Sequence, residues 1–133
     1  MNYNRVAFRY AKALLLSCKD DNEKLEEVYN AMSFVNNTFD ESEELKLFID
    51  SKVVKDSDKL ATLYEIFENL NDLSKSLIKL LMKNRRIHLY DDVSKSFIIL
   101  YNDYVGNQEV TLTTASEVEL SKLKEIEQKV KEL

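Results

Sequence analysis

Proline is absent from this 133-residue chain, and glycine occurs once, at Gly106. Sheet-rich and loop-rich folds need these residues at their turns, because proline fixes φ and glycine readily adopts positive φ. A chain almost without them is typical of helices joined by short polar turns. Hydrophobic residues make up 44% of the sequence, which is enough for a core in a domain of this length. We therefore predict an all-α fold class, a six-helix bundle.

Apolar residues recur at helical spacing in six segments. In the second segment, for example, Leu25, Val28 and Met32 are three and four residues apart, which places them on one stripe of a helix. Polar residues that can cap a helix precede several of the segments. The predicted helices cover about residues 4–18, 22–39, 42–49, 57–70, 73–84 and 88–104.

The pattern changes after Gly106. Residues 109–115 (EVTLTTA) are rich in β-branched residues that alternate at period two, which predicts a short strand. Residues 119–133 return to helical spacing, and the sequence ends inside that pattern without a terminating signal. One strand forms no sheet by itself. We therefore predict a helical bundle over residues 1–105, followed over residues 106–133 by a short strand and a truncated helix from an incomplete second domain.

The overall composition argues against several classes of protein. The net charge of −5 disfavours a nucleic-acid partner, because a duplex-binding protein needs a basic face. Cys18 is the only cysteine, so no internal disulfide can form, and we expect it to be an inert core residue. No apolar run reaches the roughly 20 residues of a membrane span, and Arg9 and Lys12 interrupt any signal-peptide pattern. We expect no direct membrane insertion.

Few residues suggest chemistry. His88 is the only histidine, and no second metal ligand or nucleophile accompanies it, so a surface position is expected. Lys83, Arg85 and Arg86 form a basic cluster, which suits the negative end of the fifth helix's dipole. No glycine-rich loop is present to cradle a phosphate beside them. The sequence predicts no catalytic residue, no cofactor and no metal.

The first helix carries more apolar surface than one core requires. At 100° per residue, its charged positions cluster within about 80°, and the next 220° or so contain one polar residue, Ser17. A helix on the surface of a bundle needs an apolar stripe of about 100° or somewhat more. In the fifth helix, apolar residues likewise cover about 200°.

Two readings of these helices stay open. In one, both helices are central in the bundle and contact neighbours on most sides. In the other, each helix has a core face and a second apolar face that pairs with a partner helix, which is a recurring mode of recognition. On the first helix, Ala7, Ala11, Leu14, Leu15 and Cys18 form the expected core flank. The opposite flank is small apart from one tyrosine, so a partner could approach closely; it consists of Val6, Tyr10, Ala13 and Ser17.

Four segments, in order along nearly the whole chain, resemble the ATP synthase delta subunit family, which includes the mitochondrial oligomycin-sensitivity-conferring protein. Arg9–Leu15 (RYAKALL) resembles the family's N-terminal signature, and Leu77–Phe97 (LIKLLMKNRRIHLYDDVSKSF) resembles its second signature. Leu45–Val54 (LKLFIDSKVV) is similar to the family's third-helix and turn region, where proline is more usual. Val110–Ala115 (VTLTTA) is similar to the strand that enters the second domain. The family is usually longer by several tens of residues.

The resemblance implies a non-catalytic stator subunit of the rotary proton-translocating ATP synthase. In this family, the N-terminal six-helix bundle sits on the catalytic head, and its first and fifth helices receive the N-terminal helix of an alpha subunit. The second domain binds the peripheral-stalk b subunit, so that the subunit resists rotor torque. The implied location is the cytoplasmic face of the inner (plasma) membrane, peripheral, through the complex.

The resemblance also indicates which residues would contact the partner. Tyr10 and Ala13 match the family's groove positions in the first helix, and neighbouring residues join them by spacing only. The fifth helix supplies further candidates. The complete set of candidate partner-binding residues is Val6, Tyr10, Ala13, Ser17, Leu77, Ile78 and Leu81.

The alternative is an unrelated helical protein-interaction or regulatory adaptor module. In that case the apolar flanks would be buried within the bundle or in a homodimer. Solvent exposure of Val6, Tyr10 and Ala13 in a monomer distinguishes the two functions.

Overall fold

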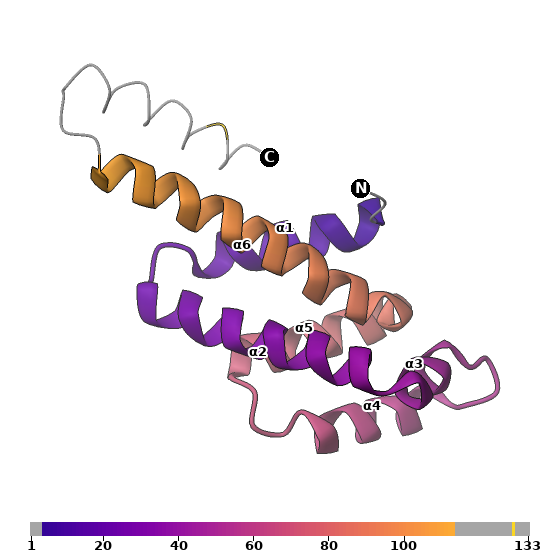
Figure 1. Cartoon of the computed structure of the whole chain (residues 1–133). Helices are drawn as coiled ribbons and strands as arrows, with labels where there is room; N and C mark the ends of the chain where they lie inside the picture. The colour runs from indigo at the N-terminus through magenta and orange to yellow at the C-terminus, as the bar shows by residue number, and fades with distance from the viewer. Residues whose placement is uncertain (1–3, 114–128, 130–133) are drawn as a thin grey trace.

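Six α-helices and one short 3-10 helix make up the part of the chain that the computed structural model describes, residues 4–113 and residue 129 (Figure 1). The predicted all-α helical bundle is confirmed for these residues. The helices are α1 Arg5–Cys18, α2 Asn22–Glu41, α3 Glu43–Asp50, α4 Asp56–Ile66, α5 Asp72–Lys83, η1 Ile87–Leu89 and α6 Tyr90–Thr113.

Polar side chains cap four of the helices at their N-termini. At α1, the backbone N–H groups of Val6 and Ala7 donate to Asn4 Oδ1, at 2.8 and 3.1 Å. These contacts satisfy donors that a helix start leaves without a partner. Asp21, Ser42 and Asn71 act in the same way for α2, α3 and α5.

The helices pack around α2 and α6. In Figure 1, α2 crosses the molecule between α6 on one side and α4 on the other. Helix α6 packs along both α1 and α2, and α2 also contacts α3 and α5. Helix α5 in turn packs against α4. Helix α1 therefore packs mainly against α6, whereas α5 packs against α4, α2 and η1.

The core side of α1 matches the sequence prediction. All five residues of the expected core flank are buried: Ala7, Ala11, Leu14, Leu15 and Cys18. Burial raises the pKa of the Cys18 thiol to about 11. Nearby charges have smaller effects, since Lys24 lowers this pKa and Asp21 raises it. Because the thiolate is the reactive form, a thiol with this pKa is inert near neutral pH.

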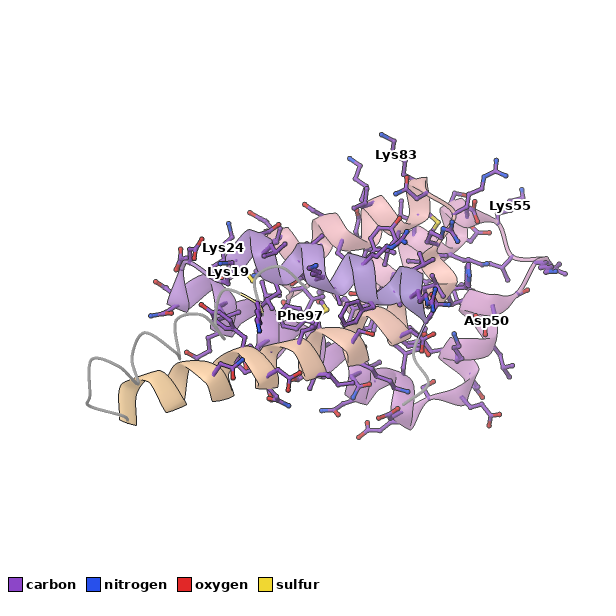
Figure 2. The ribbon with its side chains drawn as sticks, turned by 90° about the horizontal axis from the view of Figure 1, so that it is seen from above. Lys19, Lys24, Asp50, Lys55, Lys83 and Phe97 are labelled. Carbon is purple, nitrogen blue, oxygen red and sulfur yellow. The ribbon has the colours of Figure 1, made fainter. Side chains whose placement is uncertain are left out.

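A chain of aromatic rings connects α2 to the end of α4 and the start of α6. Phe67, which is 0% exposed, makes edge-to-face contacts with Phe34 and Tyr90, both with ring centroids 5.7 Å apart. Tyr90 makes a similar contact with Phe39 at 6.0 Å. Phe97 points from α6 into the bundle (Figure 2). These rings form much of the core, since each aromatic side chain buries a large apolar area.

The predicted strand over residues 109–115 is wrong for the residues that are described. Helix α6 continues through Gly106 and ends at Thr113. Gly106 has no positive φ, and a Cβ there would meet nothing within 4 Å. The physical reason for the error is backbone hydrogen bonding. Each residue added to an existing helix gains a hydrogen bond, whereas a lone strand has no neighbour to pair with.

The rest of that strand lies outside the described residues, as does the predicted helix over residues 119–133 except residue 129. The division of the chain at residue 106 therefore stays a prediction.

Helix α5 ends in a turn that usually contains glycine. The N–H of Arg86 donates to the carbonyl of Leu81 at 2.7 Å, and the N–H of Arg85 donates to that of Met82 at 3.1 Å. This pair of bonds is a Schellman motif, whose central residue adopts a left-handed conformation. Arg85 takes that position, with φ 58°. The turn ends α5 at Lys83, with Asn84 as its C-cap, and directs the chain into η1.

Candidate functional site

A shallow groove of about 140 Å³ lies between α1 and α5. We call it the α1–α5 groove. One wall comes from α1, which packs mainly against α6, and the other from α5, which packs mainly against α4. Its lining residues are Tyr10, Ala13, Leu14, Ser17, Leu73, Ser76, Leu77 and Leu80.

The α1 wall of the groove is low and apolar. Ala13 and Ser17 are exposed, and Tyr10 is half-buried. The Ser17 hydroxyl donates to the backbone carbonyl of Ala13 at 2.8 Å, so its hydrogen-bonding need is met within the helix. This wall can therefore contact an apolar surface without leaving a buried donor unpaired.

The α5 wall consists mainly of leucines. Leu80 is 45% exposed, Leu73 is half-buried and Leu77 is buried at the base. This wall therefore presents apolar side chains to the solvent along the groove.

A hydrogen bond links the two helices at one end of the groove. Asn84 Nδ2 donates to the Tyr10 hydroxyl oxygen at 2.8 Å. Asn84 caps the C-terminus of α5, whereas Tyr10 lies near the middle of α1. This contact holds α1 and α5 together at that end of the groove.

The seven predicted partner-binding residues fall into three groups. Tyr10, Ala13, Ser17 and Leu77 line the groove. Val6 is half-buried and packs against the core, but it does not line the groove. The remaining two are buried on the inner side of α5, each 0% exposed: Ile78 and Leu81. In this conformation those two residues have no surface to offer a partner.

Sequence reasoning missed three groove residues on α5, namely Leu73, Ser76 and Leu80. A signal for them was present. Leu73, Leu77 and Leu80 are spaced four and three residues apart, so they form one row along the helix. Ile78 and Leu81 belong to the adjacent row, which faces the core.

A second hollow, of about 780 Å³, lies where α3, the C-terminus of α5 and η1 meet. Lys46 lies at its edge, with Nζ 3.1 Å from Asp91 Oδ1 and 3.2 Å from Asp50 Oδ1. The same amine donates to the backbone carbonyl of His88 at 2.9 Å. Burial lowers the pKa of Lys46, but the two aspartates outweigh burial, and the net shift is upward. These pairs neutralise much of the local charge.

The predicted surface position of His88 is confirmed, since the side chain is exposed. No group of three or more His, Cys, Asp or Glu residues within the described residues could hold a metal ion. Among the same residues, no helix is long and apolar enough to cross a membrane.

Asp92 lines the second hollow and gives a pH prediction. Burial, and then the charge of Asp91, raise the pKa of the Asp92 carboxyl, although Lys46 and Lys95 partly offset this. A raised pKa in the folded state means that protonation favours folding. The stabilising contribution is present below the ordinary carboxyl pKa and is lost as pH rises through the raised value. We expect Asp92→Asn to raise the Tm at pH 7 and to have little effect at pH 3.

Thermal unfolding followed by circular dichroism at both pH values checks this prediction. Glu65→Gln changes the overall charge equally at an exposed site on α4, and it should change the Tm little at either pH. A Tm of Asp92→Asn below that of the wild type at pH 7 would contradict the assignment.

Comparison with known proteins points to one family. The family model described as "ATP synthase delta (OSCP) subunit" matches residues 6–133. A protein named ATP synthase subunit delta from Christiangramia forsetii is 37% identical over 133 residues, which is 100% of this chain and 72% of the relative. Proteins of the same name from Flavobacterium psychrophilum and Staphylococcus aureus are 33% and 31% identical over 115 and 124 residues. These alignments cover 86% and 92% of this chain, and 64% and 68% of the relatives. No solved structure matches the chain.

Proposed function

Because the chain belongs to the ATP synthase delta (OSCP) subunit family, we propose that it is a non-catalytic stator subunit of the rotary proton-translocating ATP synthase. Its helical bundle binds the catalytic head by taking the N-terminal helix of an alpha subunit into the α1–α5 groove. The observation that carries this proposal is the groove itself, which is apolar, open to solvent and lies between two helices.

The shape of the groove suits a helix better than an extended peptide. Ala13 and Ser17 let another backbone approach α1 closely. The leucine row on α5 offers side chains at helical spacing, so an amphipathic partner can place its own apolar row between them. The groove exposes no unpaired backbone of a sheet edge that an extended strand would need.

The other half of the proposed role is contact with the peripheral-stalk b subunit. We assign it to a second domain that begins near residue 106. The subunit would then connect head and stalk, and it would be attached to the cytoplasmic face of the membrane only through the complex. The alignments cover 72% and 64% of the relatives from Christiangramia forsetii and Flavobacterium psychrophilum, so both relatives are longer than the region that matches this chain.

The test is a titration of the labelled chain with a peptide of the alpha subunit N-terminus from the same organism, followed by amide chemical shifts. We expect shifts at Tyr10, Ala13 and Leu80, which line the groove. The amide of Leu47, an exposed residue on α3, should not move. Shifts confined to α3 and α4, or no shifts at all, would overturn the proposal.

A homodimer that covers the same surface would have its own signature. Groove amides would then shift with the concentration of the chain in the absence of peptide. A dilution series without peptide therefore distinguishes self-association from binding of the alpha-subunit segment.

A further inference from the structure

The surface beside the groove carries a charge opposite to that of the whole chain. The net charge is −5, yet exposed cations follow the outer edges of the groove on both helices. We call them the rim cations: Arg5, Arg9, Lys79 and Lys83.

On α1, the cations follow from the spacing of the helix. Arg9 precedes Ala13 by four residues, so the two side chains are neighbours on the helix surface. Arg5 precedes Arg9 by another four and continues the same edge. Both arginines are exposed, and neither lines the groove. They would therefore lie beside a helix bound in the groove rather than beneath it.

On α5, two lysines lie beside groove residues on the opposite edge of the groove. Lys79 follows Ser76 by three residues, and Lys83 follows Leu80 by three. Both lysines are exposed, and Lys83 points away from the bundle in Figure 2.

The rim cations have no carboxylate partner of their own among the described residues. Lys19, Lys46 and Lys95 form ion pairs in that part of the chain, whereas none of the four rim cations does. Lys46 shows the contrast, since its charge is balanced by two aspartates. The positive potential of the rim is therefore free to act on a partner.

The Tyr10–Asn84 hydrogen bond places two of the rim cations, Arg9 and Lys83, at the same end of the groove. It places the C-terminal end of α5 beside the middle of α1. Arg9 is adjacent to Tyr10 in sequence, and Lys83 is adjacent to Asn84, so both cations lie near this bond. Asp72, at the N-terminus of α5, is more than two helical turns away along that helix.

We propose that the groove selects an amphipathic helix whose apolar stripe is bordered by carboxylates, and that Arg9 and Lys83 pair with them. This inference rests on the proposed function and specifies the chemistry of the alpha-subunit segment that binds. The apolar floor supplies most of the affinity. The rim sets which helices are accepted, how fast they associate and how strongly binding depends on salt.

The test compares two double variants with the same change of charge. Arg9→Glu/Lys83→Glu reverses two rim cations, whereas Lys24→Glu/Lys52→Glu reverses two exposed lysines that lie outside α1 and α5, on α2 and in the turn after α3. Binding of the alpha N-terminal peptide is measured by stopped-flow fluorescence and calorimetry at low and high salt. We expect the rim variant to bind about tenfold more weakly at low salt, mainly through slower association. The control should bind within about twofold of the wild type.

A second peptide provides a rescue. Replacing the peptide's flanking Asp and Glu residues with Lys should weaken binding to the wild type and restore binding to the rim variant. Equal binding by the wild type, the rim variant and the control would overturn the charge inference and leave the proposed function standing. Tight groove binding by a helix without flanking carboxylates would also overturn the charge inference and leave the proposed function standing. No binding by the wild type would overturn both, since the inference depends on the proposed function.

Discussion

Ala13→Arg is expected to weaken binding of the alpha-subunit segment at least about a hundredfold, because a long charged side chain would occupy the space that a partner helix needs. Ala13 is exposed and lines the α1–α5 groove without entering the core. The free energy of unfolding should therefore change by less than about 0.5 kcal/mol. Calorimetric titration with the peptide and urea unfolding of the same preparation measure the two quantities separately.

Ala61→Arg is the matched control for this substitution. Ala61 is an exposed alanine on α4, and it does not line the groove. The Ala61→Arg substitution adds the same charge and the same volume as Ala13→Arg, at a place where no partner is expected. If Ala13→Arg binds as tightly as Ala61→Arg, the helix does not occupy the groove.

Phe67→Ala should cause a large loss of stability. The ring is 0% exposed, and it contacts Phe34 and Tyr90, so its removal leaves a cavity where α2, α4 and α6 meet. A phenylalanine truncated in a core costs about 3–5 kcal/mol. Urea unfolding followed by the helical circular dichroism signal measures the loss.

Phe34→Ala serves as the comparison, because Phe34 is half of the same ring contact but is 49% exposed. It should cost about 1 kcal/mol, since water already reaches much of the ring. Equal losses for the two variants would mean that Phe67 is not the centre of this aromatic chain.

Much of the bundle can be predicted from the sequence because local signals agree with the packing. Polar residues were expected before several of the helices, and the side chains of Asp21 and Ser42 each accept a hydrogen bond from the first turn. The core flank of α1 follows directly from the helical period. The end of α4 was predicted less well, since apolar spacing continues to Leu70 although the helix ends at Ile66. Phe67 and Leu70 are buried or half-buried from the turn itself.

The strand prediction failed for a different reason. Val110, Thr111 and Thr113 favour strands, but that preference depends on a neighbouring strand or a packed face. A helix that already extends from Tyr90 offers every further residue a hydrogen bond. The sequence pattern of a few residues cannot show whether a pairing strand exists.

The candidate site was predicted in part. The apolar excess on the first and fifth helices pointed to the two helices that form the groove, and Tyr10, Ala13, Ser17 and Leu77 line it. An apolar excess does not reveal which row of α5 faces inward. That depends on how α2 and α4 pack against it, which is why Ile78 was selected and Leu80 was not.

The most direct measurement of the central claim is co-sedimentation of this chain with the purified catalytic head of the same organism, before and after the N-terminal helix is removed from the alpha subunits. We predict that the chain sediments with the intact head, and that removal of the helix or the Ala13→Arg substitution abolishes this. Sedimentation with the trimmed head as strong as with the intact one, or failure to sediment with the intact head, would contradict the account.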